Sequence, residues 1–313
     1  MPETNSPCRF AGGIESVAVI GAGTMGAQIA ALTAFSGRTV RLYDAIPEAL
    51  DRAASRIERE ILPAIADSGQ IAGDAAAGKR IAFASTLAGA VIGVDLVIEA
   101  VREDVDVKRE VFAELSSLAP AAILGTNSSS IRSEQVADVV ERPERLLNTH
   151  FFAPVWMRTL LELMTCGRTS DEVMQRTQAF GRSLGLVTPT ITVQSKGFII
   201  NRIWRAVKRE SLRVVDEGVA TPEDIDRMWM IFFQTKQAPF GIMDMVGLDV
   251  ARDIEWSYQR ETLDPTDVPS PTLLHLIEEG KLGEKTGEGF YTHPNPAYRD
   301  PDFLRGGSND DGH

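Results

Sequence analysis

A glycine-rich turn near the start of the chain constrains its fold more than any other feature. Four apolar residues at 17–20 predict a short buried strand, and Gly21, Gly23 and Gly26 follow it as a helical pattern begins near residue 25. In such a turn the first glycine permits a tight bend, the second lets a pyrophosphate approach the backbone, and the third lets the helix pack on the strand. The pattern predicts a dinucleotide at the helix N-terminus, beside Thr24 and Met25.

Asp44 ends the next predicted strand, 18 residues after Gly26. A carboxylate at this position accepts hydrogen bonds from the ribose hydroxyls of a dinucleotide. It repels a 2′-phosphate, and residues 45–47 contain no arginine that could bind one. The pattern therefore favours NAD over NADP as the cofactor. The alternative is a glycine turn without a ligand, with Asp44 in a purely structural role at the strand end.

Short β-branched runs alternate with helical stretches through the first part of the chain. This alternation is typical of βαβ units around a parallel sheet. Strands are predicted at residues 17–20, 40–43, 81–84, 96–100, 123–125, 146–150, 160–163 and 190–193. Helices are predicted at residues 25–35, 47–65, 107–117 and 171–184. The expected fold class is α/β, with a Rossmann-like doubly wound sheet.

Longer amphipathic helices replace the alternation after about residue 193. They are predicted at residues 198–215, 222–233, 249–260 and 272–279. Thr221 as N-cap and Pro222 at the first helical position support the second of them. We therefore expect a flexible leader (1–13), an NAD-binding Rossmann domain (14–194), an all-helical domain for substrate binding and dimerisation (195–293), and a tail (294–313) that wraps the surface or is disordered.

The charge balance and the two cysteines exclude several classes of protein. The 32 basic and 44 acidic residues give 32 − 44 = −12, which argues against a nucleic-acid or anionic-membrane surface. Cys8 and Cys166 cannot form a disulfide framework, which fits a reducing compartment. There is no signal-type apolar segment at the start and no run of eighteen apolar residues. The chain is expected to be soluble and cytoplasmic, with no metal site.

His150 carries the catalytic prediction because of its neighbours in the sequence. Glu162 follows it by twelve residues, and Asn127-Ser128-Ser129-Ser130 precedes it by about twenty. Imidazole titrates near neutral pH, and a carboxylate can fix its tautomer. A histidine that meets a carboxylate and a hydroxyl in space therefore has the parts of a general base.

Several motifs in a fixed order show a resemblance to a known family. Besides the glycine turn they are Asn127-Ser128-Ser129-Ser130, Thr149-His150-Phe151-Phe152-Ala153-Pro154, Leu160-Leu161-Glu162-Leu163, Lys196-Gly197-Phe198-Ile199-Ile200-Asn201-Arg202, Gly247-Leu248-Asp249 and Lys285-Thr286-Gly287-Glu288-Gly289-Phe290-Tyr291. With them the chain resembles the L-3-hydroxyacyl-CoA dehydrogenases, of the short, single-function type. The resemblance covers residues 14 to about 291.

The resemblance implies an NAD-dependent enzyme of fatty acid metabolism that oxidises a 3-hydroxyacyl thioester at C3. His150 would take the hydroxyl proton, and Glu162 would stabilise the imidazolium that results. Ser129 and Asn201 would orient the substrate. The residues that the resemblance assigns to the cofactor are Gly21, Gly23, Thr24, Met25, Gly26, Asp44, Glu103, Lys108, Ser129 and Lys285.

Each of these residues also has a structural alternative. His150 could be a buried histidine satisfied at a strand end, and Glu162 an outward-facing acid on a strand. Ser129 could cap a helix that begins near residue 131, and Asn201 could simply favour a helix start. Glu103, Lys108 and Lys285 flank predicted helices, where charges are usually solvated.

Three positions depart from the family pattern. Ala153 stands where the family usually has Asn, Lys196 where it has Pro, and Trp156 where it tends to have a small residue. An ungapped match also places Glu60 and Asp67 where the family binds coenzyme A with a serine and a lysine, and acids do not favour an anion there. A free or carrier-protein-bound hydroxy acid is therefore an alternative substrate.

The helical domain offers more apolar surface than one small bundle hides. Ile199, Ile200, Ile203, Trp204 and Val207 lie in one predicted helix, and residues 228–233 of the next are all apolar. Related enzymes pair through this domain, so a homodimer is expected. A remote alternative is a non-catalytic NAD-binding protein, since a fold alone does not guarantee activity.

Overall fold

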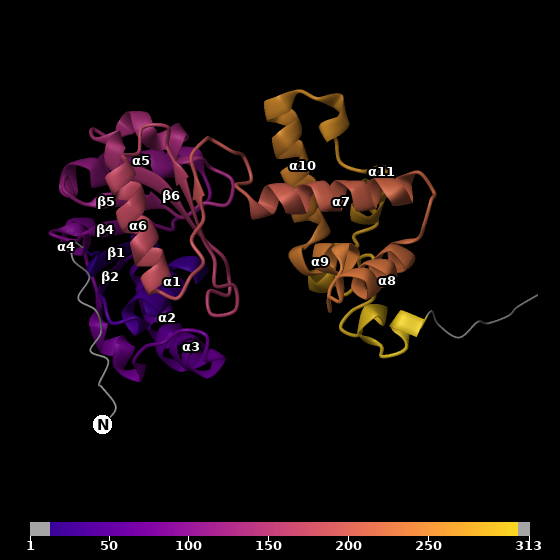
Figure 1. Ribbon diagram of the computed structural model, residues 1–313, viewed down its shortest axis with the longest axis horizontal. Helices are drawn as coiled ribbons and strands as arrows, with labels where there is room; N and C mark the ends of the chain where they lie inside the picture. Colours follow the sequence, from indigo (N-terminus) through magenta and orange to yellow (C-terminus); the bar gives the residue numbers. More distant parts are fainter. Residues whose placement is uncertain (1–12, 306–313) are drawn as a thin grey trace, which may run out of the picture. The chain divides into compact units, whose positions relative to one another are not determined.

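The computed structural model describes residues 13–305 and divides into two compact units, Met1–Asn201 and Arg202–His313 (Figure 1). The predicted leader, apart from residue 13, and the last eight residues of the predicted tail lie outside the described residues. The first unit extends past the predicted boundary at residue 194. It does so because the backbone N–H groups of Ile199 and Ile200 donate to Glu162 inside that unit.

An eight-stranded sheet forms the centre of the first unit, in the order β3-β2-β1-β4-β5-β6-β7-β8. Strands β1 to β6 pair in parallel, β7 is antiparallel to β6, and β8 is parallel to β7. The strands are β1 (Ser16–Ile20), β2 (Thr39–Tyr43), β3 (Ile81–Phe83), β4 (Leu96–Glu99), β5 (Ile123–Thr126), β6 (Leu146–Phe151), β7 (Leu161–Thr165) and β8 (Thr190–Ile191). All eight predicted strands are confirmed, with ends shifted by up to two residues.

Helices cover both faces of this sheet, which confirms the doubly wound fold class (Figure 1). Side chains of successive residues in a strand point to opposite faces, so Val17 and Val19 join one core and Ala18 and Ile20 the other. The helices are α1 (Thr24–Phe35), α2 (Pro47–Arg56), the π-helix η1 (Ile57–Ile61), α3 (Leu62–Ser68), α4 (Leu87–Val91), α5 (Val105–Leu118) and α6 (Asp171–Ser183). The helix predicted at 47–65 is therefore three consecutive helical segments, with a π-turn between the two α-helices.

The second unit is helical. Its helices are α7 (Ile200–Asp216, which begins at the end of the first unit), α8 (Pro222–Phe233), α9 (Pro239–Val246), α10 (Leu248–Thr262) and α11 (Pro271–Glu278). Its core includes Leu212, Phe240, Met243, Leu248 and Leu273. Thr221 caps α8 as predicted, because its hydroxyl accepts from the Asp224 N–H.

Part of the predicted tail packs on the second unit. Tyr298 and Phe303 are buried in its core, and the Arg227 guanidinium donates to the Phe303 carbonyl at 2.8 Å. Residues 294–305 therefore wrap the surface, which was one of the two expected outcomes for the tail. Among the described residues, the helices lack the length and apolar character that a membrane span requires.

Candidate active site

The glycine turn has the geometry that its sequence predicts. Gly21 has φ of +104°, and a Cβ on it would lie 2.5 Å from the Ala100 carbonyl oxygen. A Cβ on Gly26 would lie 1.8 Å from the Gly21 oxygen, so only glycine lets α1 pack this closely. A Cβ on Gly23 would meet nothing within 4 Å. The space beside Gly23, at the positive end of α1, is therefore suited to a pyrophosphate.

Asp44 lies beside this turn at the end of β2. One carboxylate oxygen accepts from the Ala22 N–H at 2.7 Å, and the other accepts from the Ile46 N–H at 2.9 Å. A carboxylate has about four acceptor positions, so two remain for ribose hydroxyls. Asp44 thus has a structural contact to the turn and can still bind a ribose.

His150 and Glu162 face each other across the antiparallel pair β6 and β7, where they are directly opposite in register. His150 Nδ1 lies 2.9 Å from Glu162 Oε2. Both side chains are buried, with 2% and 3% of their surface exposed. The spacing of twelve residues in the sequence is thus produced by a β-hairpin, which brings the two side chains together on one face of the sheet.

The second oxygen of Glu162 binds the start of α7. Oε1 accepts from the N–H groups of Ile199 and Ile200, at 3.1 Å and 2.9 Å. These N–H groups lie at the positive end of a helix, which favours an ionised carboxylate. The ring of Phe198, 4.8 Å from the His150 ring, closes one side of the imidazole, and Phe152 lies 4.2 Å away. The carboxylate of Glu162 is therefore held by His150 at one oxygen and by the start of α7 at the other.

Ser129 supplies the hydroxyl that the sequence predicted beside His150. It lies in the serine loop (residues 127–130), which follows β5. Ser129 Oγ is 3.1 Å from His150 Nε2. The Asn127 amide oxygen accepts from the Phe151 N–H at 3.0 Å and ties the same loop to β6. Hydroxyl, imidazole and carboxylate therefore form one chain: Ser129, His150, Glu162.

Glu103 and Lys108 belong to a second polar network beneath the serine loop. Glu103 accepts from donors of Ser128, Ser129 and Ser130. The Lys108 ammonium is fully buried and lies 2.7 Å from Glu99 Oε1 and 3.5 Å from Glu103 Oε2. The structure thus places Lys108 inside the unit, whereas sequence analysis assigned it to the cofactor.

The remaining predicted residues lie as follows. Asn201 is the second residue of α7 and is half-buried. Lys285 belongs to the second unit, where its ammonium pairs with Asp249 and lowers the pKa of that carboxyl. Trp156 packs against the core of the first unit, and Lys196 precedes the turn that carries Phe198.

Sequence analysis missed Glu99 and the helix-start amides that bind Glu162. Glu99 is the last residue of β4, and its Oε2 accepts from the Thr126 hydroxyl at 2.7 Å, at the end of β5. Burial raises the pKa of Glu99, while Lys108 and the hydrogen bonds oppose this. An acid at the end of an otherwise apolar strand was the signal available in the sequence.

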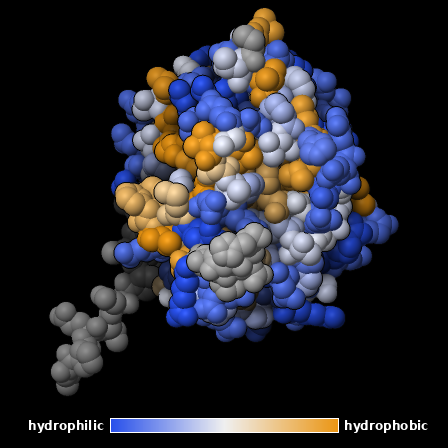
Figure 2. All heavy atoms as spheres, turned by 90° about the vertical axis from the view of Figure 1, so that its right-hand side faces the viewer, coloured by the Kyte–Doolittle hydropathy of each residue, from blue (hydrophilic) through white to orange (hydrophobic). Residues whose placement is uncertain are grey.

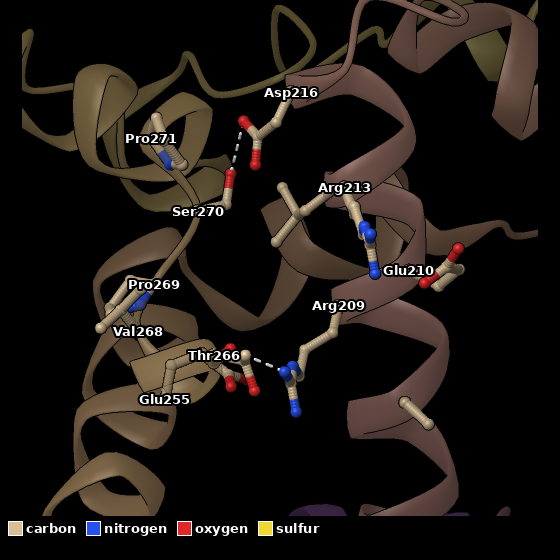
Figure 3. Close-up of a pocket in the computed structure, with 12 residues that line it drawn as sticks. Arg209, Glu210, Arg213, Asp216, Glu255, Thr266, Val268, Pro269, Ser270 and Pro271 are labelled. Carbon is tan, nitrogen blue, oxygen red and sulfur yellow. Dashed lines mark hydrogen bonds between the residues drawn. The ribbon is translucent and has the colours of Figure 1, made fainter. Parts of the chain in front are cut away.

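A cavity of about 520 Å³ lies in the second unit, between α7, α10 and residues 266–271 (Figure 3). Arg209 reaches Asp267 and the Thr266 carbonyl, both at 2.7 Å, and Asp216 accepts from the Ser270 hydroxyl at 3.0 Å. Arg209 and Asp216 thus already have hydrogen-bond partners around the cavity. The cavity holds no counterpart of the Ser129–His150–Glu162 chain, so the candidate active site is in the first unit.

Comparisons with known proteins match both parts of the chain. Residues 16–194 match the sequence family described as 3-hydroxyacyl-CoA dehydrogenase, NAD binding domain, and residues 197–293 match its C-terminal domain. The human mitochondrial hydroxyacyl-coenzyme A dehydrogenase is 34% identical over 288 residues, covering 90% of this chain and 91% of that protein.

Solved structures agree with the sequence matches. The (S)-3-hydroxybutyryl-CoA dehydrogenase from Ralstonia eutropha has a TM-score of 0.83 and 30% identity, over 90% of this chain and all of that one. A diketoreductase, described as acting on dicarbonyl compounds, has a TM-score of 0.79 and 35% identity, over 90% of this chain and 99% of its own. The chain belongs to the 3-hydroxyacyl-CoA dehydrogenase family of NAD-dependent enzymes that act on a secondary alcohol.

Proposed function

We propose that this protein oxidises a 3-hydroxyacyl-CoA at C3 to the 3-oxoacyl product, with His150 as the general base. The observation that carries the proposal is the position of His150, with Nδ1 on Glu162 and Nε2 beside the Ser129 hydroxyl. A base needs one nitrogen that can accept a proton and a partner that stabilises the cation formed. In His150 the accepting nitrogen is Nε2, 3.1 Å from the Ser129 hydroxyl, and the partner is Glu162, 2.9 Å from Nδ1.

The residues divide the chemistry between them. The Nδ1–H of His150 donates a hydrogen bond to Glu162, which leaves Nε2 as the acceptor for the substrate hydroxyl proton. The carboxylate of Glu162 stabilises the imidazolium that forms. Ser129 orients the substrate hydroxyl, and Asn201 is proposed to orient the acyl group.

When bound, NAD would supply the acceptor for the hydride that leaves C3. The turn at Gly21, Gly23 and Gly26 is proposed to hold its pyrophosphate, with Thr24 and Met25 beside the phosphates, and Asp44 its ribose. The carboxylate of Asp44 also disfavours a 2′-phosphate. Glu103, Ser129 and Lys285 remain predicted cofactor contacts. A direct contact from Lys108 also remains a prediction, although its complete burial favours an indirect role.

An NADH-coupled screen over short and long 3-hydroxyacyl-CoAs and their free acids tests this proposal. The expected result is NADH formation with at least one L-3-hydroxyacyl-CoA, and a kcat/KM far above that for the free acid. Tight NAD binding without NADH formation from any substrate would instead support a non-catalytic NAD-binding protein.

A second candidate substrate is a hydroxy acid that is free or bound to a carrier protein. Glu60 and Asp67 are exposed on the helical stretch from α2 to α3, a surface that does not attract the phosphates of coenzyme A. Lys196 is then proposed to meet a carboxylate or a phosphate, with Ala153 and Trp156 shaping the pocket. If Lys196→Pro left the kinetics on every carboxylate and thioester unchanged, this candidate would lose its support.

A homodimer through the helical unit is the proposed assembly. Figure 2 shows hydrophobic side chains gathered on the face that carries this unit. Met228, Ile231, Phe232 and Phe233 of α8 are all more than half exposed, and Phe232 is 80% exposed. Phe232→Asp is expected to give a monomer in sedimentation at micromolar concentration, whereas the control Ile92→Asp, at an exposed residue of the first unit, stays dimeric. A wild-type monomer would contradict the proposal.

A cytoplasmic location also remains a prediction, and curated relatives include mitochondrial enzymes.

A further inference from the structure

One carboxylate oxygen of Glu103 accepts hydrogen bonds from several donors of the serine loop. Oε1 accepts from the backbone N–H groups of Ser129 and Ser130, both at 3.0 Å. It also accepts from the hydroxyls of Ser130 at 2.9 Å and Ser128 at 2.5 Å. Three consecutive residues are thus tied to one carboxylate oxygen, and the middle one is Ser129.

The place of Ser129 matters because its hydroxyl lies 3.1 Å from His150 Nε2. Ser129 itself is exposed, so core packing does not hold it. The Ser128 hydroxyl accepts from the Ile131 N–H at 2.7 Å and shapes the end of the loop. The backbone of Ser129, in contrast, is bound by Glu103.

Glu103 is in turn held from inside the unit. Its Oε2 lies 3.5 Å from the Lys108 ammonium, which is fully buried and also lies 2.7 Å from Glu99. Burial raises the pKa of Glu103, but Lys108 and the serine donors outweigh it, so the pKa is below its usual value. Glu103 is therefore an ionised acceptor at neutral pH, and charged acceptors make the stronger hydrogen bonds.

We propose that Glu103, anchored by the buried Lys108, is a positioning residue that places the Ser129 hydroxyl against His150. This inference rests on the proposed function, in which Ser129 orients the substrate hydroxyl beside the base. It gives Lys108 a role that needs no contact with the cofactor. It also predicts that Glu103 acts on kcat through Ser129.

A double-mutant cycle tests the inference, with Glu103→Ala, Ser129→Ala and the double variant, and with Glu110→Ala as control. Glu110 is exposed on helix α5, which begins two residues after Glu103, and it is not one of the partners described above for the serine loop. A displacement of about 1 Å in a site can cost about a hundredfold in rate, so Glu103→Ala is expected to lower kcat about ten- to a hundredfold. The kcat of Glu110→Ala should be unchanged. The Kd for NAD is measured in parallel, because Glu103 also remains a predicted cofactor contact.

The double variant decides the outcome. If Glu103 acts through Ser129, Glu103→Ala adds no more than about twofold to the loss already caused by Ser129→Ala. Glu103→Gln keeps an amide oxygen for the loop and should recover part of kcat, which also covers the case in which Glu103→Ala fails to fold.

Three results would overturn the inference, and they are distinguishable. If Ser129→Ala lowers kcat but the two losses multiply, Glu103 acts independently of Ser129 and only the positioning role fails. The same holds if Glu103→Ala weakens NAD binding and leaves kcat unchanged. If Ser129→Ala turns over at the wild-type rate, the proposed role of Ser129 fails, and the positioning role fails with it.

Discussion

Each unit of this protein contains a buried histidine–carboxylate pair, and the two pairs are similar at first sight. His150 Nδ1 lies 2.9 Å from Glu162 in the first unit, and His293 Nε2 lies 3.0 Å from Asp244 in the second. All four side chains are at most 4% exposed. A histidine beside a carboxylate is therefore not sufficient to identify a catalytic pair.

The second nitrogen of each ring distinguishes them. His150 Nε2 faces the Ser129 hydroxyl, a small neutral group next to the proposed substrate position. His293 Nδ1 faces another carboxylate, that of Glu284, at 3.9 Å. Asp244 also accepts from the N–H groups of Phe290 and Tyr291, so it holds the C-terminal segment against α9. We therefore propose that the first pair exchanges a proton with a ligand and that the second stabilises the fold.

Replacing His150 with Gln is expected to have the largest effect. Gln cannot accept the substrate proton, and general-base catalysis contributes about 10²- to 10⁴-fold, so kcat should fall by at least about a hundredfold. The Kd for NAD should not change. Steady-state NADH formation and cofactor titration measure the two quantities. Near-normal turnover would end the proposed mechanism.

Glu162→Gln is expected to lower kcat by about a hundredfold or more, because the amide can no longer stabilise the imidazolium or fix its tautomer. The same change replaces one carboxylate oxygen by an NH2 group, so an acceptor is lost either to His150 or to the N–H groups at the start of α7. Measuring kcat and the Kd for NAD together separates catalysis from binding. If kcat were unchanged, the His150–Glu162 pair would have no more of a catalytic role than the His293–Asp244 pair.

His293→Leu is expected to reduce stability and leave chemistry intact. Removing one partner of a buried pair leaves Asp244 uncompensated, and the free energy of unfolding should fall by about 2 kcal/mol or more. The control is His275→Leu in the same unit, where the side chain is 70% exposed and the change should be below about 1 kcal/mol. Urea denaturation measures both. A stable His293→Leu variant without turnover would contradict the comparison.

The stability of the second unit should depend on pH, because this unit contains buried carboxylates. Burial raises the pKa of Asp226 from 3.8 to about 6. Its protonated form is therefore favoured in the folded state, so its stabilising contribution is complete below about pH 4 and is lost as the pH rises to about 6. The advantage of wild type over Asp226→Asn in unfolding free energy should shrink across this window, by up to about 1.4 kcal/mol per pH unit. A constant difference from pH 4 to 7 would show that Asp226 does not titrate there.

Local patterns made the sheet and the glycine turn predictable, and the resemblance singled out the candidate site residues. The roles of Gly21, Gly23 and Gly26 follow from backbone sterics, and the twelve-residue spacing of His150 and Glu162 corresponds to a hairpin. Helices α4 and α9 were missed. The first has only five residues, and the second is almost uniformly apolar, so neither shows a helical period.

Long-range contacts were not predictable in the same way. Glu162 accepts from the Ile199 N–H, 37 residues away in the sequence, and no periodic pattern in the sequence predicts such a contact. The resemblance placed Lys108 at the cofactor, and a lysine is rarely buried without a partner. Its partner Glu99 was hidden at the end of an apolar strand, and only the folded unit brings the two charges together.

The rate of hydride transfer tests the role of His150 most directly. In single-turnover experiments with saturating NAD and an L-3-hydroxyacyl-CoA, His150→Gln should form NADH at least about a hundredfold more slowly than wild type, because general-base catalysis contributes about 10²- to 10⁴-fold. His293→Gln should form NADH at the wild-type rate. A His150→Gln variant that retains the wild-type rate would contradict the account.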